Sequence, residues 1–274
     1  MINDNKKEKG VVLYHSGAGS TKFIAQLITE ELSPFFDMEI SHIKNEFNNE
    51  KLNRYSFVVF GFPTHHAEPS LSMLEYVSGL NKFSVSPKAF IFTSYGLYPG
   101  NSLRIFAKFL NKKNIRVLGS EEFKSPASDG VLLFPDKLKF MFNFEQNLYR
   151  KIKNFAKQVV SCKTSENNKL PPYKWYVPLN NLIKPLGEFT YGKYKKNISA
   201  DTDLCIKCNK CIDNCERNAW INISEYPVFV VDKCEFCLEC IHKCPVNAIS
   251  FSENMKNKPR LNEKFFKTVK YEQL

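Results

Sequence analysis

The chain has 274 residues, of which 43% are hydrophobic, and a formal net charge of +11 with an isoelectric point near 9.1. These values predict one large or two modest domains. No apolar run approaches the length of a membrane helix, and the charged N-terminus shows no secretory signal, so we expect a cytoplasmic protein without a membrane span. The basic charge would suit nucleic acid, but no nucleic-acid-binding module is present, and we expect no nucleic-acid partner.

Residues 9–126 alternate between strand-like and helix-like segments. Strands are predicted at Gly10–His15, Met38–Ile43, Ser56–Phe62, Lys88–Ser94 and Ile115–Phe123, and helices at Thr21–Leu32, Leu71–Leu80, Ser102–Asn114 and Gln146–Val160. The runs at 57–60 and 89–92 are apolar throughout, which is typical of strands buried on both faces of a parallel sheet. This alternation predicts an α/β fold, a five-stranded doubly wound parallel sheet with its ligand site at the carboxyl ends of the strands.

The first predicted strand ends in a loop of small residues, 16–21. A P-loop would need its lysine earlier, and Lys22 occupies the third glycine position of a dinucleotide fingerprint. The remaining interpretation is a hydroxyl-rich loop that binds one terminal phosphate through Ser16, Ser20, Thr21 and backbone N–H groups. A helix N-cap without any ligand is the alternative.

The second half of the chain changes character. We divide the sequence into a domain at 1–162, a linker at 163–200, a small domain at 201–252 and a polar, lysine-rich tail at 253–274. The prolines of the linker predict that it forms no long helix, and its aromatic residues predict that it packs on another part of the chain. The segment 201–250 carries eight acidic and five basic residues, so we expect it to dock on the basic remainder of the chain.

Nine cysteines without an export signal favour metal ligation over disulfides. Eight of them form two C-x2-C-x2-C-x3-C arrays 29 residues apart, with the fourth cysteine of each array expected to serve the other cluster. This arrangement predicts two [4Fe–4S] clusters, one on Cys205, Cys208, Cys211 and Cys244, the other on Cys234, Cys237, Cys240 and Cys215. Zinc sites use paired C-x2-C knuckles instead, and Cys162 is expected to be a free thiol.

Residues 201–252 resemble a bacterial two-cluster ferredoxin, although Glu216 replaces a proline that the second array keeps as Pro245. The N-terminal domain resembles flavodoxin, whose phosphate loop Ser-Gly-Thr-Gly-Asn-Thr corresponds to Ser16, Gly17, Ala18, Gly19, Ser20 and Thr21. The whole chain therefore resembles the flavodoxin–ferredoxin fusion proteins of anaerobic bacteria. This resemblance implies an FMN whose phosphate lies in the first loop.

By the same resemblance, two further loops flank the flavin ring. One consists of Pro63, Thr64, His65, His66 and Ala67, and the other contains Ser94, Tyr95, Gly96, Leu97, Tyr98, Gly100 and Asn101. Tyr95 or Tyr98 is expected to stack on the ring, and His65 and His66 are candidate catalytic residues because a histidine there could titrate near neutrality and donate a proton.

Two functions follow from this interpretation. The first is an electron-transfer protein that passes low-potential electrons between the clusters, the FMN and an unidentified redox protein partner. The alternative is a flavin-dependent reductase of a small-molecule acceptor, fed by the clusters, which would make the chain an oxidoreductase enzyme. The electron carrier is favoured. No nicotinamide fingerprint is present, so we do not expect direct oxidation of NAD(P)H.

Overall fold

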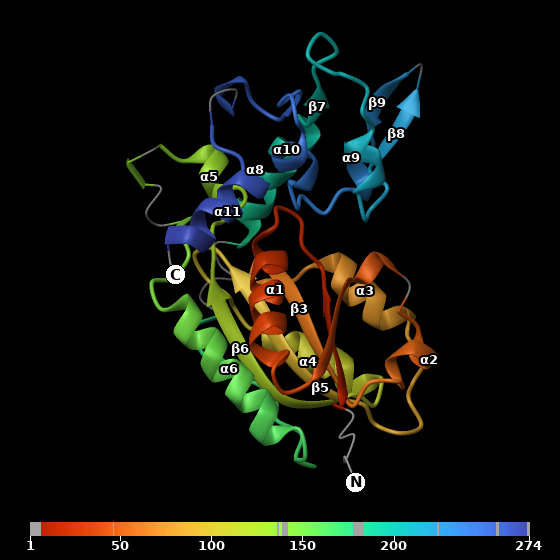
Figure 1. Ribbon diagram of the computed structural model, residues 1–274. Coiled ribbons are helices and arrows are strands. Elements are labelled where there is room, and N and C mark those ends of the chain that lie inside the picture. Colours follow the sequence, from red (N-terminus) through yellow and green to blue (C-terminus); the bar gives the residue numbers. More distant parts are fainter. Residues whose placement is uncertain are drawn as a thin grey trace.

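Figure 1 shows the computed structural model of the chain, which describes residues 7–45, 47–135, 137–138, 142–177, 184–223, 225–255 and 258–272. Five parallel strands, in the order β2-β1-β3-β5-β6, form the N-terminal sheet. They are β1 (Lys9–Tyr14), β2 (Asp37–His42), β3 (Phe57–His65), β5 (Lys88–Tyr95) and β6 (Arg116–Lys124), and a short β4 (Glu68–Pro69) pairs antiparallel with the end of β3. This is the strand order of a flavodoxin-like doubly wound sheet, and it confirms the predicted fold class.

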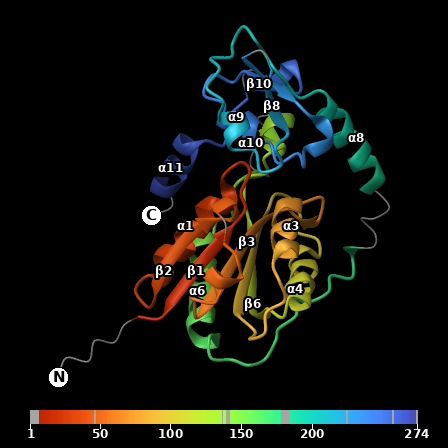
Figure 2. The same cartoon turned by 90° about the vertical axis from the view of Figure 1, so that its right-hand side faces the viewer.

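Helices cover both faces of the sheet (Figure 2). The helices α1 (Ser20–Leu32) and α6 (Leu148–Cys162) pack on one face, and α3 (Leu71–Gly79) and α4 (Ser102–Lys112) pack on the other. Along β1, Val12 belongs to the first core whereas Val11 and Leu13 belong to the second. Burial on both faces explains the continuous apolar runs, and each predicted strand and helix of this domain is present within three residues of its expected bounds.

The short elements of this domain were not predicted. Among the described residues they are β4, the helices α2 (Asn49–Leu52) and α5 (Gly130–Leu133), and a 3-10 turn at Ile43–Asn45. Of these, α5 follows the loop after β6 at the carboxyl edge of the sheet.

The linker packs against the N-terminal domain, as its aromatic residues predicted. Lys169 donates its backbone N–H to the carbonyl of Val117 in β6 at 2.6 Å. The expectation that its prolines exclude a long helix is wrong, because α8 (Lys184–Lys196) has 13 residues. The one proline in α8, at position 185, lies in the first turn, where a missing N–H removes no intrahelical hydrogen bond.

The C-terminal half lies over the carboxyl ends of the parallel strands (Figures 1 and 2). Its elements are β7 (Ser199–Ala200) paired with β10 (Ile249–Ser250), the hairpin β8 (Trp220–Ile223) and β9 (Tyr226–Phe229), the short helices α9 (Lys210–Asp213) and α10 (Glu239–Lys243), and the 3-10 turns Val231–Lys233 and Glu253–Met255. Its core, which includes Trp220 and Ile241, is continuous with Ala18 and Leu132 of the N-terminal half. Among the described residues, no helix is both long and apolar enough to cross a membrane.

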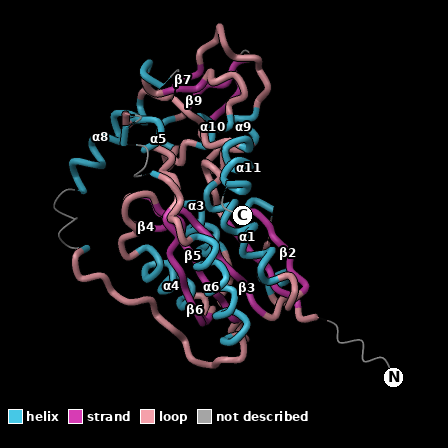
Figure 3. Tube along the Cα trace, turned by 60° about the vertical axis from the view of Figure 1, so that its left-hand side comes forward, coloured by secondary structure: helices cyan, strands magenta, loops and turns pink. Residues whose placement is uncertain are grey.

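The expected polar tail forms a helix that returns to the first domain. This helix, α11 (Glu263–Glu272), lies beside α1 (Figure 3). Phe266 stacks on Phe23 of α1 with ring centroids 5.6 Å apart. A Cβ atom on Gly19 would lie 2.6 Å from the Phe266 ring, so α11 covers the loop that follows β1.

Candidate functional site

A cavity of about 700 Å³ lies at the carboxyl edge of the sheet. The three loops predicted from the sequence meet there, and most of residues 16–21, 63–67 and 94–98 line it. Gly19, Gly100 and Asn101 do not line the cavity. The cavity is also lined by Cys237, a predicted cluster ligand, and by residues that the sequence analysis did not assign to a site: the loop 125–130, Phe134, Phe142, Tyr176, Val177, Tyr191 and Phe236.

The first loop has the features of an anion site. Gly19 has a φ of 111°, a backbone conformation that side chains disfavour, and α1 begins directly after it. The backbone N–H groups of this first turn have no partner inside the helix and carry partial positive charge. The hydroxyl-bearing residues Ser16, Ser20 and Thr21 are buried. Thr21 Oγ1 lies 2.7 Å from Ser94 Oγ, which joins the first loop to the third.

Two enclosed polar atoms in the cavity lining have no hydrogen-bond partner among the described residues. They are Nε2 of His65 and Oη of Tyr98. An unpaired buried polar group costs about 1–3 kcal/mol, so both atoms are suited to bond a ligand. Burial lowers the pKa of His65 from its ordinary value. Burial also raises the pKa of Tyr95 to about 12, which keeps its hydroxyl protonated.

His66 and Ala67 form the tip of the β3–β4 turn, with φ angles of 51° and 66°. The His66 ring meets the ring of Tyr191 edge-on, with centroids 4.4 Å apart. The Tyr191 hydroxyl in turn donates to Asp129 Oδ2 at 2.5 Å. Gly100 lies directly under the turn, where a Cβ atom would collide with the Ala67 carbonyl oxygen. The second loop therefore contacts the third loop through Gly100 and α8 through Tyr191.

The two cysteine arrays share one backbone conformation. Six non-glycine residues with positive φ occupy equivalent places in the arrays: Lys207, Asn209 and Asn218 in the first, and Phe236, Leu238 and Asn247 in the second. The Ala219 N–H donates to Cys215 Sγ at 3.3 Å, and the equivalent Ala248 N–H donates to Cys244 Sγ at 3.2 Å. The internal duplication seen in the sequence is thus also a duplication of structure.

The cysteines have the donor chemistry of iron–sulfur sites. A small cavity is lined by Cys205, Cys208, Cys211 and Cys244, the four ligands predicted for one cluster, together with Cys240. Burial raises the pKa values of Cys234, Cys237 and Cys240 in the other predicted group, so their thiolates need nearby positive charge, which iron would supply. No three potential ligands in the described part of the chain are grouped tightly enough to hold a single metal ion.

The second cysteine array touches the first loop of the flavodoxin-like domain. A Cβ atom on Gly17 would lie 2.7 Å from the carbonyl oxygen of Cys237 and 2.8 Å from its Cβ. Only a glycine allows the two backbones to approach this closely. Cys237 and its neighbour Phe236 also line the 700 Å³ cavity, so the cysteine array and the cavity are contiguous.

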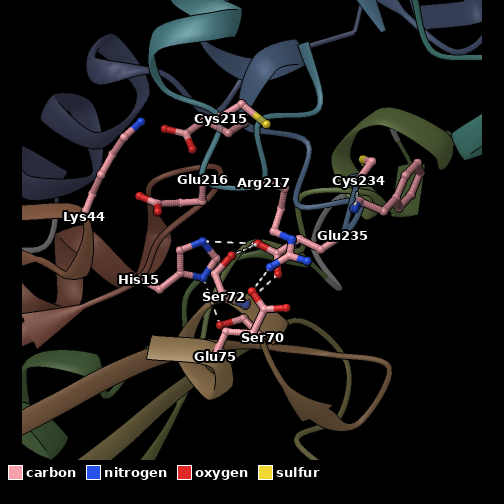
Figure 4. A network of polar contacts seen from close by, with 12 residues as sticks. His15, Lys44, Ser70, Ser72, Glu75, Cys215, Glu216, Arg217, Cys234 and Glu235 are labelled. Carbon is pink, nitrogen blue, oxygen red and sulfur yellow. Dashed lines mark hydrogen bonds and ion pairs between the residues drawn. The ribbon is translucent and has the colours of Figure 1, made fainter. Parts of the chain in front are cut away.

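Polar side chains join the two halves around this contact (Figure 4). Glu216, the residue that replaces the family proline, lies 3.0 Å from His42 Nδ1. Lys44 donates to the carbonyl of Asp213 in the same region. Arg217 of the C-terminal half pairs with Glu75 of α3. In this pair the basic residue belongs to the segment with the acidic net charge, and the acidic residue belongs to the basic remainder of the chain. The described part of the interface therefore contains individual polar pairs of both polarities.

Comparison with known proteins identifies the C-terminal half. Residues 227–250 match the family model of the 4Fe-4S binding domain. The pyruvate synthase subunit PorD of Methanocaldococcus jannaschii is 40% identical over 77 residues, which is 27% of this chain and 84% of that protein.

Among solved structures, the N-terminal half is similar to flavodoxins. Flavodoxin 2 of Bacillus cereus has a TM-score of 0.42 at 19% identity, covering 56% of this chain and 98% of that one. A flavodoxin from the domain Archaea has a TM-score of 0.39 at 20% identity, covering 56% and 99%. The strand order, rather than these scores, defines the fold of this half. The chain belongs to the ferredoxin family in its C-terminal part, an iron–sulfur electron-transfer domain, and joins this part to an N-terminal half with a flavodoxin-like fold.

Proposed function

We propose that the chain binds FMN in the 700 Å³ cavity and two [4Fe–4S] clusters in the cysteine arrays, and transfers single electrons between them and a redox protein partner. The observation that supports this most directly is the shared boundary of the two sites. Cys237, a proposed cluster ligand, lines the cavity and contacts Gly17 of the proposed phosphate loop.

Each part of the site has an assigned task under this proposal. Ser16, Ser20, Thr21 and the first backbone N–H groups of α1 hold the phosphate. His65 Nε2 and Tyr98 Oη bond polar atoms of the ring. The cysteines hold the clusters in the groups 205/208/211/244 and 234/237/240/215. When bound, the clusters supply one-electron chemistry, and the flavin supplies one- or two-electron chemistry.

The two proposed cluster groups differ in their surroundings. Cys237 lies against the loop at Gly17 of the flavodoxin-like domain, whereas Cys208 is exposed to solvent. The exposed Ile206 beside Cys208 adds an apolar surface there. We therefore assign the first group to the exchange of electrons with the partner, and the second group to the exchange with the flavin. The similarity to a subunit of a larger enzyme, pyruvate synthase, supports a protein as this partner.

Anaerobic purification with iron, sulfide and flavin counted per chain tests this proposal. We expect about eight iron atoms, eight sulfides and one FMN, as two cubanes and one flavin require. Reduction of the clusters by a chemical reductant should then be followed by loss of the oxidised flavin absorbance. Material that carried zinc, or that retained no flavin when FMN was supplied in excess, would refute the proposal.

A reductase of a small molecule is a second candidate, and the lining of the cavity favours it. The hydroxyl of Tyr191, bonded to Asp129, lies next to His66 and provides exchangeable protons at the edge of the cavity. Multiple turnovers with a small acceptor in the absence of any protein partner would establish this activity. Electron transfer to protein acceptors alone would exclude it.

A further inference from the structure

The second cysteine array carries a buried carboxylate. Glu235 lies between the proposed ligands Cys234 and Cys237, and its side chain is only 4% exposed. Its carboxylate points away from the C-terminal half and toward the start of α3 and the end of β1 (Figure 4). This position distinguishes it from the acidic residues elsewhere in the arrays.

The N-terminal domain provides the hydrogen-bond donors for this carboxylate. Ser72 donates its backbone N–H to Glu235 Oε2 at 3.0 Å and its hydroxyl to Oε1 at 2.8 Å. Ser72 lies in the first turn of α3, where free N–H groups and the helix dipole favour a negative charge. Nε2 of His15 lies 3.3 Å from Oε1, and Nδ1 of the same ring lies 2.9 Å from Ser70 Oγ.

These contacts make the relative position of the two halves specific. A buried carboxylate without partners is strongly unfavourable, because it loses its hydration. Glu235 finds its hydrogen-bond donors on Ser72, so separation of the halves or a slip along the interface would leave it unpaired or force it into water. The two hydrogen bonds from Ser72 also fix the direction of the side chain, as a single contact would not.

The same loop carries the residues that approach the flavin cavity. Phe236 and Cys237 follow Glu235 directly, and both line the cavity. Cys237 also contacts Gly17. Holding Glu235 on α3 therefore holds the adjacent proposed ligand against the proposed phosphate loop.

We propose that Glu235 is a positioning residue that anchors the second cysteine array on α3 and thereby sets the rate of electron transfer within the chain. This inference rests on the proposed function, because it assumes clusters and a flavin on either side of the contact. The side chain acts through Ser72 and requires no role as a cluster ligand.

Glu239 provides a matched control on the same array. It also precedes a proposed ligand, Cys240, and it is buried, but it pairs with Lys243 of its own helix. Replacing it by glutamine removes a buried negative charge next to a cluster without changing the contact with Ser72. Glu235→Gln retains one oxygen that can accept from Ser72, whereas Glu235→Ala retains none.

The experiment compares full-length chains purified anaerobically, with cofactors counted per chain. The rate of flavin reduction is measured after the clusters have been reduced rapidly. Hydrogen bonds to a charged group correspond to a factor of about ten or more in an equilibrium constant, so we expect Glu235→Ala to slow flavin reduction by about tenfold or more. Glu235→Gln should slow it less. Glu239→Gln should change it by less than about twofold. Hydrogen–deuterium exchange of residues 70–79 should rise in Glu235→Ala and stay unchanged in Glu239→Gln.

A variant in α3 changes the same contact from the other side and leaves the cysteine loop unaltered, so loss of clusters would not explain its effect. Ser72→Asp places a second carboxylate against Glu235 without touching the cysteine loop, and it should slow the same step. Unchanged rates and exchange in Glu235→Ala and Ser72→Asp, with cofactors fully retained, would overturn the inference. Failure of the proposed function is a separate result, because the unmodified chain would then lack iron or flavin, or would fail to transfer electrons.

Discussion

The contact between the phosphate loop and the cysteine array can be tested by replacing Gly17 with alanine. The backbone of Gly17 is not in the left-handed region, so alanine is conformationally allowed there. The added methyl group would lie 2.7 Å from the Cys237 carbonyl oxygen, whereas ordinary contacts begin at 3.4 Å. The two loops must therefore separate by about 0.7 Å. The opposing atoms belong to the Cys237 backbone and its Cβ, which cannot rotate away as a flexible side chain would.

Overpacking of this kind costs about 1–3 kcal/mol. For a chain of this size we expect a fall in melting temperature of about 2–10 °C, together with less bound flavin because the displaced loop is the proposed phosphate site. Circular dichroism melting curves and flavin counts per chain measure both effects. Gly79→Ala is the matched control, because a Cβ atom there meets no atom within 4 Å. Equal melting temperatures and flavin contents in the two variants would show that the loops do not touch.

Three further predictions concern other parts of the structure. Cys208→Ser should lower the iron count per chain measured after anaerobic purification, whereas Cys162→Ser should leave it unchanged. Phe266→Ala removes the ring that stacks on Phe23, so melting curves should show a loss of about 1–3 kcal/mol, and an unchanged midpoint would contradict the packing of α11. Burial lowers the pKa of His15 from 6.5 to about 4, so as the pH falls the unfolded chain binds the proton first. The free energy of unfolding, measured with denaturant, should therefore fall by up to about 3 kcal/mol between pH 6.5 and 4, and His15→Gln should reduce this fall.

The N-terminal sheet could be predicted from the sequence because its physical causes are local. Strands buried on both faces leave continuous apolar runs such as 57–60 and 89–92. Parallel connections then bring the loops after β1, β3 and β5 to one edge without further information. The cysteine arrays could also be predicted, because their spacing repeats in the sequence. In the structure their backbone conformation repeats with the same period.

The interface could not be predicted in the same way, because its contacts join residues far apart in the chain. Ser72 and Glu235 are separated by 163 positions and follow no periodic pattern. Phe266, which covers Gly19, lies in a segment whose lysines suggested only a solvated tail. One signal was present in the sequence: Glu216 departs from the family proline, and the structure places it 3.0 Å from His42.

The arrangement also constrains how electrons reach the proposed flavin. The carboxyl edge of the sheet is covered by the second cysteine array, and Tyr176 and Tyr191 line the same cavity. A protein partner therefore cannot dock directly on the loop at Gly17, which is already in contact with Cys237. It can approach the exposed Cys208, on the proposed cluster group that does not line the cavity. On the proposed assignment, the fusion does more than tether two carriers, because the second cysteine array lies directly against the proposed phosphate loop and lines the same cavity.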